Sequence, residues 1–181
     1  MKGIVFSEFN DMVEETFSPE ILDRIIEKAA LPSGGAYTSV GTYDHVELVS
    51  LVTHLSEETG IDAGELVRAF GKHLAGRFAT QYPAFFNGVD GTLDFLETIE
   101  AHVHVEVRKL YPDAELPIFD TRRHDRDHLQ MTYRSNRPFA DLAEGLILGC
   151  AEHFNENLKI SREDNQHNGI NESRFAIQQQ N

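Results

Sequence analysis

The chain has 181 residues, of which 40% are hydrophobic and 25% are charged, and its formal net charge is −14 at pH 7. Such a composition is typical of one globular unit with a sizeable core. The strong excess of acidic residues argues against nucleic acid and against an acidic membrane surface as partners, because both need clustered lysine and arginine.

The amino-terminal stretch MKGIVFSEFNDMVEETF carries acidic residues within its apolar pattern, so it does not resemble a signal peptide. No run of the sequence approaches the ~18 apolar residues of a membrane-spanning helix. Cys150 is the single cysteine, which rules out an internal disulfide. Its apolar helical surroundings predict a small buried side chain. These features together predict a cytoplasmic protein.

Helical periodicity dominates the first two thirds of the chain. Capping residues mark two of the helix starts, Ser18-Pro19 and Asp62, and Gly60 marks one helix end. Helices are predicted over residues 2–17, from Pro19 through Ile26, over 44–59, from Asp62 towards Phe78, and as one long helix over 92–110 that Pro112 ends.

The helical pattern of hydrophobic residues ends after Leu116. Alternating residues predict a strand that runs through Leu129 to Arg137, and Pro138 opens a last helix. Residues 157–161 and 173–178 are predicted to form a terminal hairpin, joined across a loop that contains Asn168-Gly169. The predicted fold class is α+β: a helical amino-terminal part precedes a part with an antiparallel sheet and packed helices.

The predicted strand raises a question of chemistry. Alternation places Tyr133, Ser135 and Arg137 on the same face as Leu129 and Met131. Two hydroxyls and a guanidinium therefore point the same way as apolar side chains. This arrangement suits a ligand that is largely apolar and carries carboxylates, which bind arginine through bidentate, charge-assisted hydrogen bonds.

Nine histidines invite a metal hypothesis. The densest group consists of His124, Asp125, Asp127 and His128, residue types that hold zinc, iron or manganese. A metal-dependent hydrolase built on this group is one alternative, and a solvated loop that leads into the strand is the other. HExxH, P-loop and GxGxxG motifs are all absent from the sequence.

The long predicted helix contains two further histidines, His102 and His104. They flank its apolar stripe at roughly 100° on opposite sides, so periodicity does not choose between them. A histidine beside an apolar face, together with the strand described above, suits haem: its iron takes an axial imidazole and its propionates take the arginine.

Four stretches resemble one known family. The start MKGIVF, the segment VHVEVRKLYPDAELP, the motif Tyr-x-Ser-x-Arg at 133–137 and the segment AEGLILG together resemble the haem nitric oxide/oxygen binding (H-NOX) domains. These are related to the haem domain of soluble guanylate cyclase. The resemblance implies one H-NOX domain over residues 1–181, with a distal helical subdomain at about 1–60 and a proximal subdomain at about 61–181.

The resemblance also implies roles for particular residues. His104 aligns with the axial ligand of the iron of haem b, and His102 becomes a surface residue. Tyr133, Ser135 and Arg137 would hold the propionates, and Pro117 matches a proline that presses on the porphyrin. The family members are sensors, so no enzymatic activity is expected.

The residues expected on the distal side of the haem, where the gas binds, predict which gas the protein prefers. Oxygen-binding relatives carry a tyrosine at the position of Leu142, and its hydrogen bond stabilises bound oxygen. Here the matching positions are all apolar, so we expect poor oxygen binding and a nitric oxide sensor that also binds CO. An oxygen or redox haem sensor and a haem carrier are the alternatives. The other aligned distal residues are Val5, Phe9, Leu74, Phe78 and Leu146.

The resemblance implies an output as well. In the family, nitric oxide weakens the bond between the axial histidine and iron, and the subdomains then shift. This sequence contains no catalytic segment, so we expect a separate partner, a histidine kinase or a cyclic-di-GMP-metabolising protein. The stretch SREDNQHNGINESRF lacks the cysteines of the zinc site that several relatives carry, and His167 alone cannot hold zinc. No structural zinc is expected.

Overall fold

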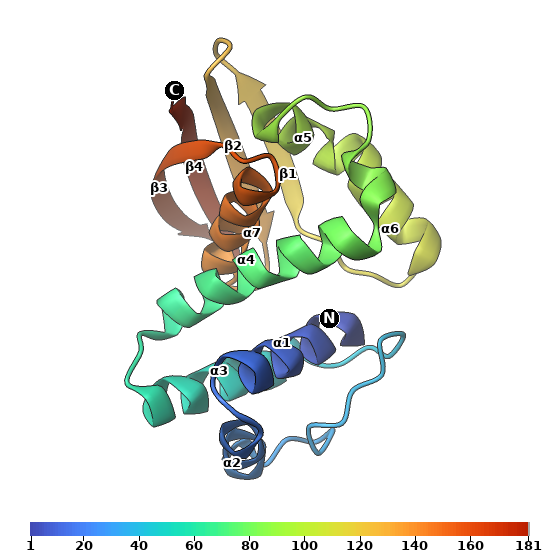
Figure 1. Ribbon diagram of the computed structural model, residues 1–181, viewed down its shortest axis with the longest axis vertical. Coiled ribbons are helices and arrows are strands. Elements are labelled where there is room, and N and C mark those ends of the chain that lie inside the picture. Colours follow the sequence, from blue (N-terminus) through green and yellow to red (C-terminus); the bar gives the residue numbers. More distant parts are fainter. Residues whose placement is uncertain (181) are drawn as a thin grey trace.

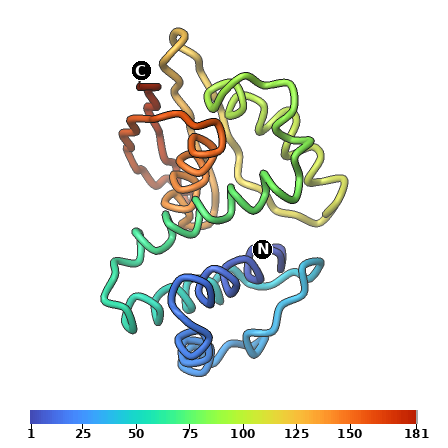
Figure 2. Tube along the Cα trace, viewed as in Figure 1, coloured from blue at the N-terminus to red at the C-terminus, as the bar shows by residue number. Residues whose placement is uncertain are grey.

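A computed structural model describes residues 1–180 of the chain. Figure 1 shows a helical group at the amino-terminal end and a sheet with packed helices at the other, and Figure 2 traces the chain between them. The elements are, in chain order, α1 (Gly3–Thr16), α2 (Pro19–Ala29), α3 (His45–Thr59), α4 (Ala63–Gln81), the 3₁₀ turn η1 (Pro83–Phe86), α5 (Thr92–Thr98), the π-helical turn η2 (Ile99–Val103), α6 (His104–Leu110), β1 (Ile118–Arg123), β2 (His128–Ser135), α7 (Ala140–His153), β3 (Asn157–His167) and β4 (Ile170–Gln180).

The predicted caps define several helix ends. The Ser18 hydroxyl accepts a hydrogen bond of 3.3 Å from the Ile21 amide at the start of α2. The Asp62 carboxylate accepts one of 2.9 Å from the Gly64 amide at the start of α4. Gly60 ends α3 with φ of 73°, a left-handed conformation that glycine adopts without strain.

The amino-terminal helices and α4 enclose one hydrophobic core. Its centre consists of side chains with no exposed surface, among them Phe6, Phe9, Ile25, Leu51 and Phe70. The rings of Phe9 and Phe70 meet edge to face, with centroids 5.2 Å apart, and so join α1 to α4. In Figure 1, α4 crosses between this helical group and the sheet-containing part, so both parts pack on it.

The four strands form one antiparallel sheet in the order β1-β2-β4-β3. Leu129, Met131, Phe175 and Ile177 are buried on the sheet in a cluster that includes Ile147 of α7. The sheet therefore has one face covered by the helix and one free of it, as is common for antiparallel sheets. The fold class is α+β, as predicted.

Three details differ from the sequence prediction. The strand β2 ends at Ser135, so Arg137 lies beyond it in a bend. Residues 118–123, for which no strand is predicted, form β1. The predicted helix over 92–110 is interrupted by the π-helical turn η2, where the His104 amide donates to the Ile99 carbonyl. The terminal hairpin is confirmed, and its strands are longer than the sequence indicated.

Helices α4 and α7 approach each other through glycines. A Cβ atom on Gly145 would lie 2.1 Å from the Arg68 carbonyl oxygen, and one on Gly71 would lie 2.5 Å from the Leu142 carbonyl oxygen. Both distances are far below van der Waals contact. Glycine is thus required for this close approach, which sets the position of α7 and its side chains relative to α4.

We predict that Gly145→Ala destabilises the protein by about 1–3 kcal/mol, because the added methyl group meets backbone that cannot rotate away. Gly76→Ala is the matched control, since Gly76 lies in α4 and a Cβ there meets nothing within 4 Å. Alanine should leave stability unchanged there, or raise it by up to about 1 kcal/mol. Urea denaturation followed by circular dichroism measures both. Equal effects of the two substitutions would contradict the tight contact.

Candidate functional site

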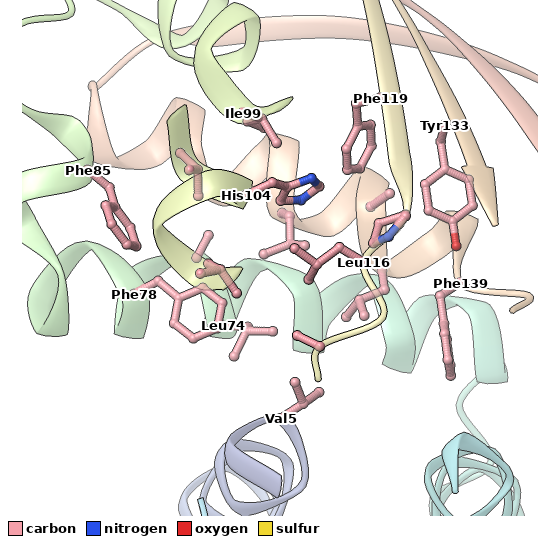
Figure 3. A pocket seen from close by; sticks show the side chains of 18 of the residues that line it. Val5, Leu74, Phe78, Phe85, Ile99, His104, Leu116, Phe119, Tyr133 and Phe139 are labelled. Atoms are coloured by element: carbon pink, nitrogen blue, oxygen red, sulfur yellow. The ribbon is translucent and has the colours of Figure 1, made fainter. Parts of the chain in front are cut away.

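A mainly apolar cavity of about 300 Å³ lies between α4, α6, α7 and the sheet. Figure 3 shows His104 on one side of it, with Leu74 and Val5 on the opposite side. The size is at the lower end of small-molecule pockets. The lining side chains that bear on its chemistry are Val5, Leu74, Phe78, Tyr82, Ile99, His104, Pro117, Phe119, Tyr133, Ser135, Arg137, Leu142, Leu146 and Cys150.

The His104 side chain is the one imidazole among these residues. It is 7% exposed, and its Nδ1 atom lies 3.1 Å from Oε2 of Glu100. Within residues 1–180, its Nε2 atom makes no hydrogen bond to protein. Burial lowers the pKa of His104, although the Glu100 carboxylate opposes the shift. The ring is therefore neutral at pH 7, the form in which a histidine binds a metal.

The fold distinguishes the two histidines that periodicity left equal. His102 is exposed, 6.4 Å from the Phe85 ring between centroids, and does not line the cavity. His104 begins α6 directly after the π-helical turn and lines the cavity. Of the two rings, only that of His104 is therefore placed to meet a ligand in the cavity.

Tyr133, Ser135 and Arg137 meet at the cavity, although only the first two lie in β2. The Tyr133 hydroxyl donates to the Arg137 carbonyl at 3.1 Å, and the Ser135 hydroxyl accepts from the Arg137 amide at 3.1 Å. The two hydroxyls therefore fix the backbone of Arg137. Its guanidinium donates to the Glu115 carbonyl at 3.2 Å and is paired with the Glu115 carboxylate. This geometry already suits a carboxylate.

The wall opposite His104 is apolar, as predicted for Val5, Leu74, Phe78, Leu142 and Leu146, which all line the cavity.

Phe9 is the remaining residue that the resemblance assigns to the distal wall. It is fully buried in the amino-terminal core against Phe70 and does not line this cavity, so its place beside haem stays a prediction. Val5 and Phe9 are four residues apart on α1, and only Val5 reaches the cavity.

Three residues at the site escaped the sequence analysis. Glu100 contacts His104, and its only signal was the i, i+4 spacing of the two residues on a helix. Phe119 lies on the unpredicted strand β1, with its ring centroid 5.7 Å from that of His104. Tyr82 lines the cavity from the end of α4, and burial raises its pKa. It stacks on Phe85 with ring centroids 5.5 Å apart.

Pro117 and Cys150 also lie in the cavity wall. Pro117 lies in the segment between α6 and β1, next to the start of the strand that carries Phe119. Cys150 is buried, which raises its pKa to about 12 and keeps the thiol protonated. It is the small buried side chain that the sequence indicated.

The proposed hydrolase site does not assemble. His128 and Asp125 form a pair at 2.8 Å in the turn before β2. Across residues 1–180, however, no three histidine, cysteine or acidic side chains come together as metal ligands. The group at 124–128 is a solvated turn, and the loop interpretation of its sequence holds.

The donor set of the cavity fits haem. A neutral buried imidazole has one nitrogen fixed by Glu100 and leaves the other available in an apolar space. A guanidinium with a hydrogen-bonded backbone lies in the wall of the same cavity. A flat apolar ring with an iron atom and two carboxylates complements both features.

Comparison with known proteins places these features in one family. The profile described as Haem-NO-binding matches residues 2–162. The Fe(II) unliganded H-NOX protein from K. algicida is 38% identical, with 100% of this chain and 97% of that chain covered and a TM-score of 0.93. An H-NOX protein from S. oneidensis, solved in the Fe(II)NO ligation state, is 29% identical over 100% of both chains, with a TM-score of 0.91.

We predict that His104→Gly abolishes stable haem retention, because it removes the buried imidazole, and that added free imidazole restores it. The Soret absorbance of purified protein measures retention. His102→Gly is the control and should keep the wild-type spectrum, since that ring is exposed. Loss of haem from the His102 variant but not from the His104 variant would show that the ligand is misassigned.

We also predict that Arg137→Ala speeds haem transfer to apomyoglobin. It leaves the propionates without their charged donor, at a cost of about 1–3 kcal/mol, which corresponds to roughly 5- to 150-fold. Arg134→Ala is the matched control, because Arg134 is paired with Asp120 and Glu172 instead and does not line the cavity. Equal rates for the two variants would remove Arg137 from the propionate site.

Proposed function

The chain belongs to the Haem-NO-binding (H-NOX) family of haem-based gas sensors, and we propose that it senses nitric oxide at a ferrous haem b. It is a sensor domain and not an enzyme. The observation that carries the proposal is the pairing of a buried, neutral imidazole with an apolar wall across the same cavity. CO is expected to bind as well.

We propose that His104 holds the iron through Nε2 and that Arg137 binds the propionates. Tyr133 and Ser135 support the latter role through their hydrogen bonds to the Arg137 backbone. Pro117 would contact the porphyrin from the cavity wall. The haem would supply a ferrous iron that can bind a diatomic gas.

The apolar wall supports the choice of nitric oxide over oxygen. Oxygen at ferrous iron gains affinity from a hydrogen-bond donor, because it takes on partial negative charge. Leu74, Leu142 and Leu146 supply no donor. Nitric oxide binds iron strongly without one, so these three leucines disfavour oxygen and leave nitric oxide unaffected. The S. oneidensis relative was solved with NO on Fe(II), which also supports this choice.

We propose that residues 1–60 and 61–181 form the distal and proximal subdomains and that the signal is a shift between them. Contacts that join these parts support the proposal. The Lys2 ammonium lies 3.1 Å from the Asp113 carboxylate, just after α6. Glu8 on α1 is buried and accepts from Arg77 on α4 at 2.7 Å. A change at the His104 helix can therefore reach α1 through a short path.

The receiver of the signal is proposed to be a separate protein, a histidine kinase or a cyclic-di-GMP-metabolising protein. The net charge of −14 suits docking on a basic surface of such a partner. Among the helices of residues 1–180, none is long and apolar enough to cross a membrane.

The direct test of the proposed function is an absorption spectrum of the ferrous protein with and without nitric oxide and in air. We expect a Soret band that shifts with nitric oxide and with CO, and that gives no stable oxygen complex in air. A stable oxygen spectrum would instead make the protein an oxygen sensor. A colourless protein after haem loading would overturn the proposal altogether.

We predict that Leu142→Tyr raises oxygen affinity by roughly 10- to 150-fold, because the new hydroxyl adds a hydrogen bond to a charged group worth about 1.5–3 kcal/mol. Leu142→Phe is the matched control, since it adds the same ring without the hydroxyl. Oxygen titration of the reduced proteins at low temperature measures the change. A gain in the phenylalanine variant equal to that in the tyrosine variant would point to cavity shape rather than hydrogen bonding.

A further inference from the structure

The face of His104 that points away from the cavity has a partner of its own. Oε2 of Glu100 lies 3.1 Å from Nδ1 of the imidazole. A carboxylate is only an acceptor at neutral pH, so Nδ1 carries the proton and Nε2 carries the lone pair. The contact therefore selects the tautomer in which Nε2 is free to bind a metal.

Glu100 lies in the π-helical turn that leads into His104. Side chains four residues apart are neighbours on a helix surface. The turn η2 (Ile99–Val103) is closed by the bond from the His104 amide to the Ile99 carbonyl. Turns of this kind are rare and occur frequently at functional sites.

Glu100 is itself held in place. The Oε2 atom that accepts from His104 also accepts from the Phe119 amide at 3.1 Å. Its other oxygen lies 3.6 Å from the Arg108 guanidinium. The carboxylate thus joins α6 to β1, and its position is fixed from both elements even though its side chain is 37% exposed. The histidine side chain that it contacts is only 9% exposed.

We propose that Glu100 is the positioning residue of the axial ligand: it orients the His104 ring, fixes its tautomer and increases its electron donation to the iron. The proposal rests on the proposed haem site. Its physical basis is that a carboxylate which accepts from the outer nitrogen of a metal-bound imidazole makes the ring a stronger base. Protein groups behind a ligand commonly set its affinity in this way.

Glu100→Gln is the sharpest substitution, because the amide keeps the size and one acceptor oxygen but removes the charge. Glu100→Leu removes the acceptor as well. Glu106→Gln is the matched control: Glu106 lies two residues from His104 and is paired with Lys109 instead. It removes one negative charge close to the histidine without touching the ring.

Two spectroscopic quantities report on the proposal in haem-loaded ferrous protein. The iron–imidazole stretching band in resonance Raman spectra should move to lower wavenumber from wild type to the glutamine and then the leucine variant. The midpoint potential of the haem should become more positive in the same order. Haem transfer to apomyoglobin should be about 10- to 100-fold faster for Glu100→Leu. The Glu106 variant should match wild type in all three.

A measurement on the wild-type protein tests the proposal even if a variant fails to fold. Proton NMR of the protein with haem and CO should show a His104 Nδ1 proton that exchanges slowly with water and lies close to the Phe119 amide proton. Its absence would overturn the proposal.

An unchanged Raman band in Glu100→Gln, or equal shifts in the Glu100 and Glu106 glutamine variants, would overturn the role of Glu100 and leave the haem sensor intact. A wild-type protein that takes up no haem would overturn both proposals.

Discussion

The neutral imidazole of His104, set at the border of an apolar cavity, is the group on which the rest of the site depends. Desolvation keeps it uncharged, and Glu100 satisfies the nitrogen that faces away from the cavity. A buried polar ring without such a partner would cost free energy. Here Nδ1 is hydrogen-bonded to protein and Nε2 is left for a ligand, so the same ring is buried and still able to bind a ligand.

The position of the opposite wall depends on how closely the backbones of α4 and α7 approach each other. Glycines on α4 and α7 let the two helices approach so closely that a methyl group on Gly145 would overlap the Arg68 carbonyl. This contact fixes where Leu74 on one helix and Leu142 on the other reach the cavity. The polarity of the wall is set by leucine side chains whose positions depend on glycines in the two helices.

Local patterns predicted most of the helices and the hairpin, because periodicity and caps act over a few residues. They could not predict β1, which alternates between exposed and half-buried residues and carries the charged residues Asp120, Arg122 and Arg123 among its six. The π-helical turn leaves no mark in a sequence whose apolar spacing continues through it. Periodicity places His102 and His104 on opposite sides of the apolar stripe, and only the packed structure shows that His104 is the one that lines the cavity. One helix face can serve both a core and a cavity, so the spacing of Val5 and Phe9 on α1 does not show which of them reaches the cavity.

The net negative charge of the molecule explains why a carboxylate ligand needs a positively charged donor such as Arg137 close to it. A net charge of −14 opposes the approach of an anion. At physiological ionic strength, however, that repulsion fades over about 8 Å, so the nearest charges decide. Arg137, with a side chain 13% exposed, meets the carboxylate of Glu115, which is 75% exposed. A well-exposed glutamate side chain loses little interaction free energy when water replaces its charged partner. In the proposed haem complex, a propionate inside the cavity would meet the same guanidinium with less competition from water. The exchange of one carboxylate for the other would therefore favour the buried ligand, even on a strongly acidic protein.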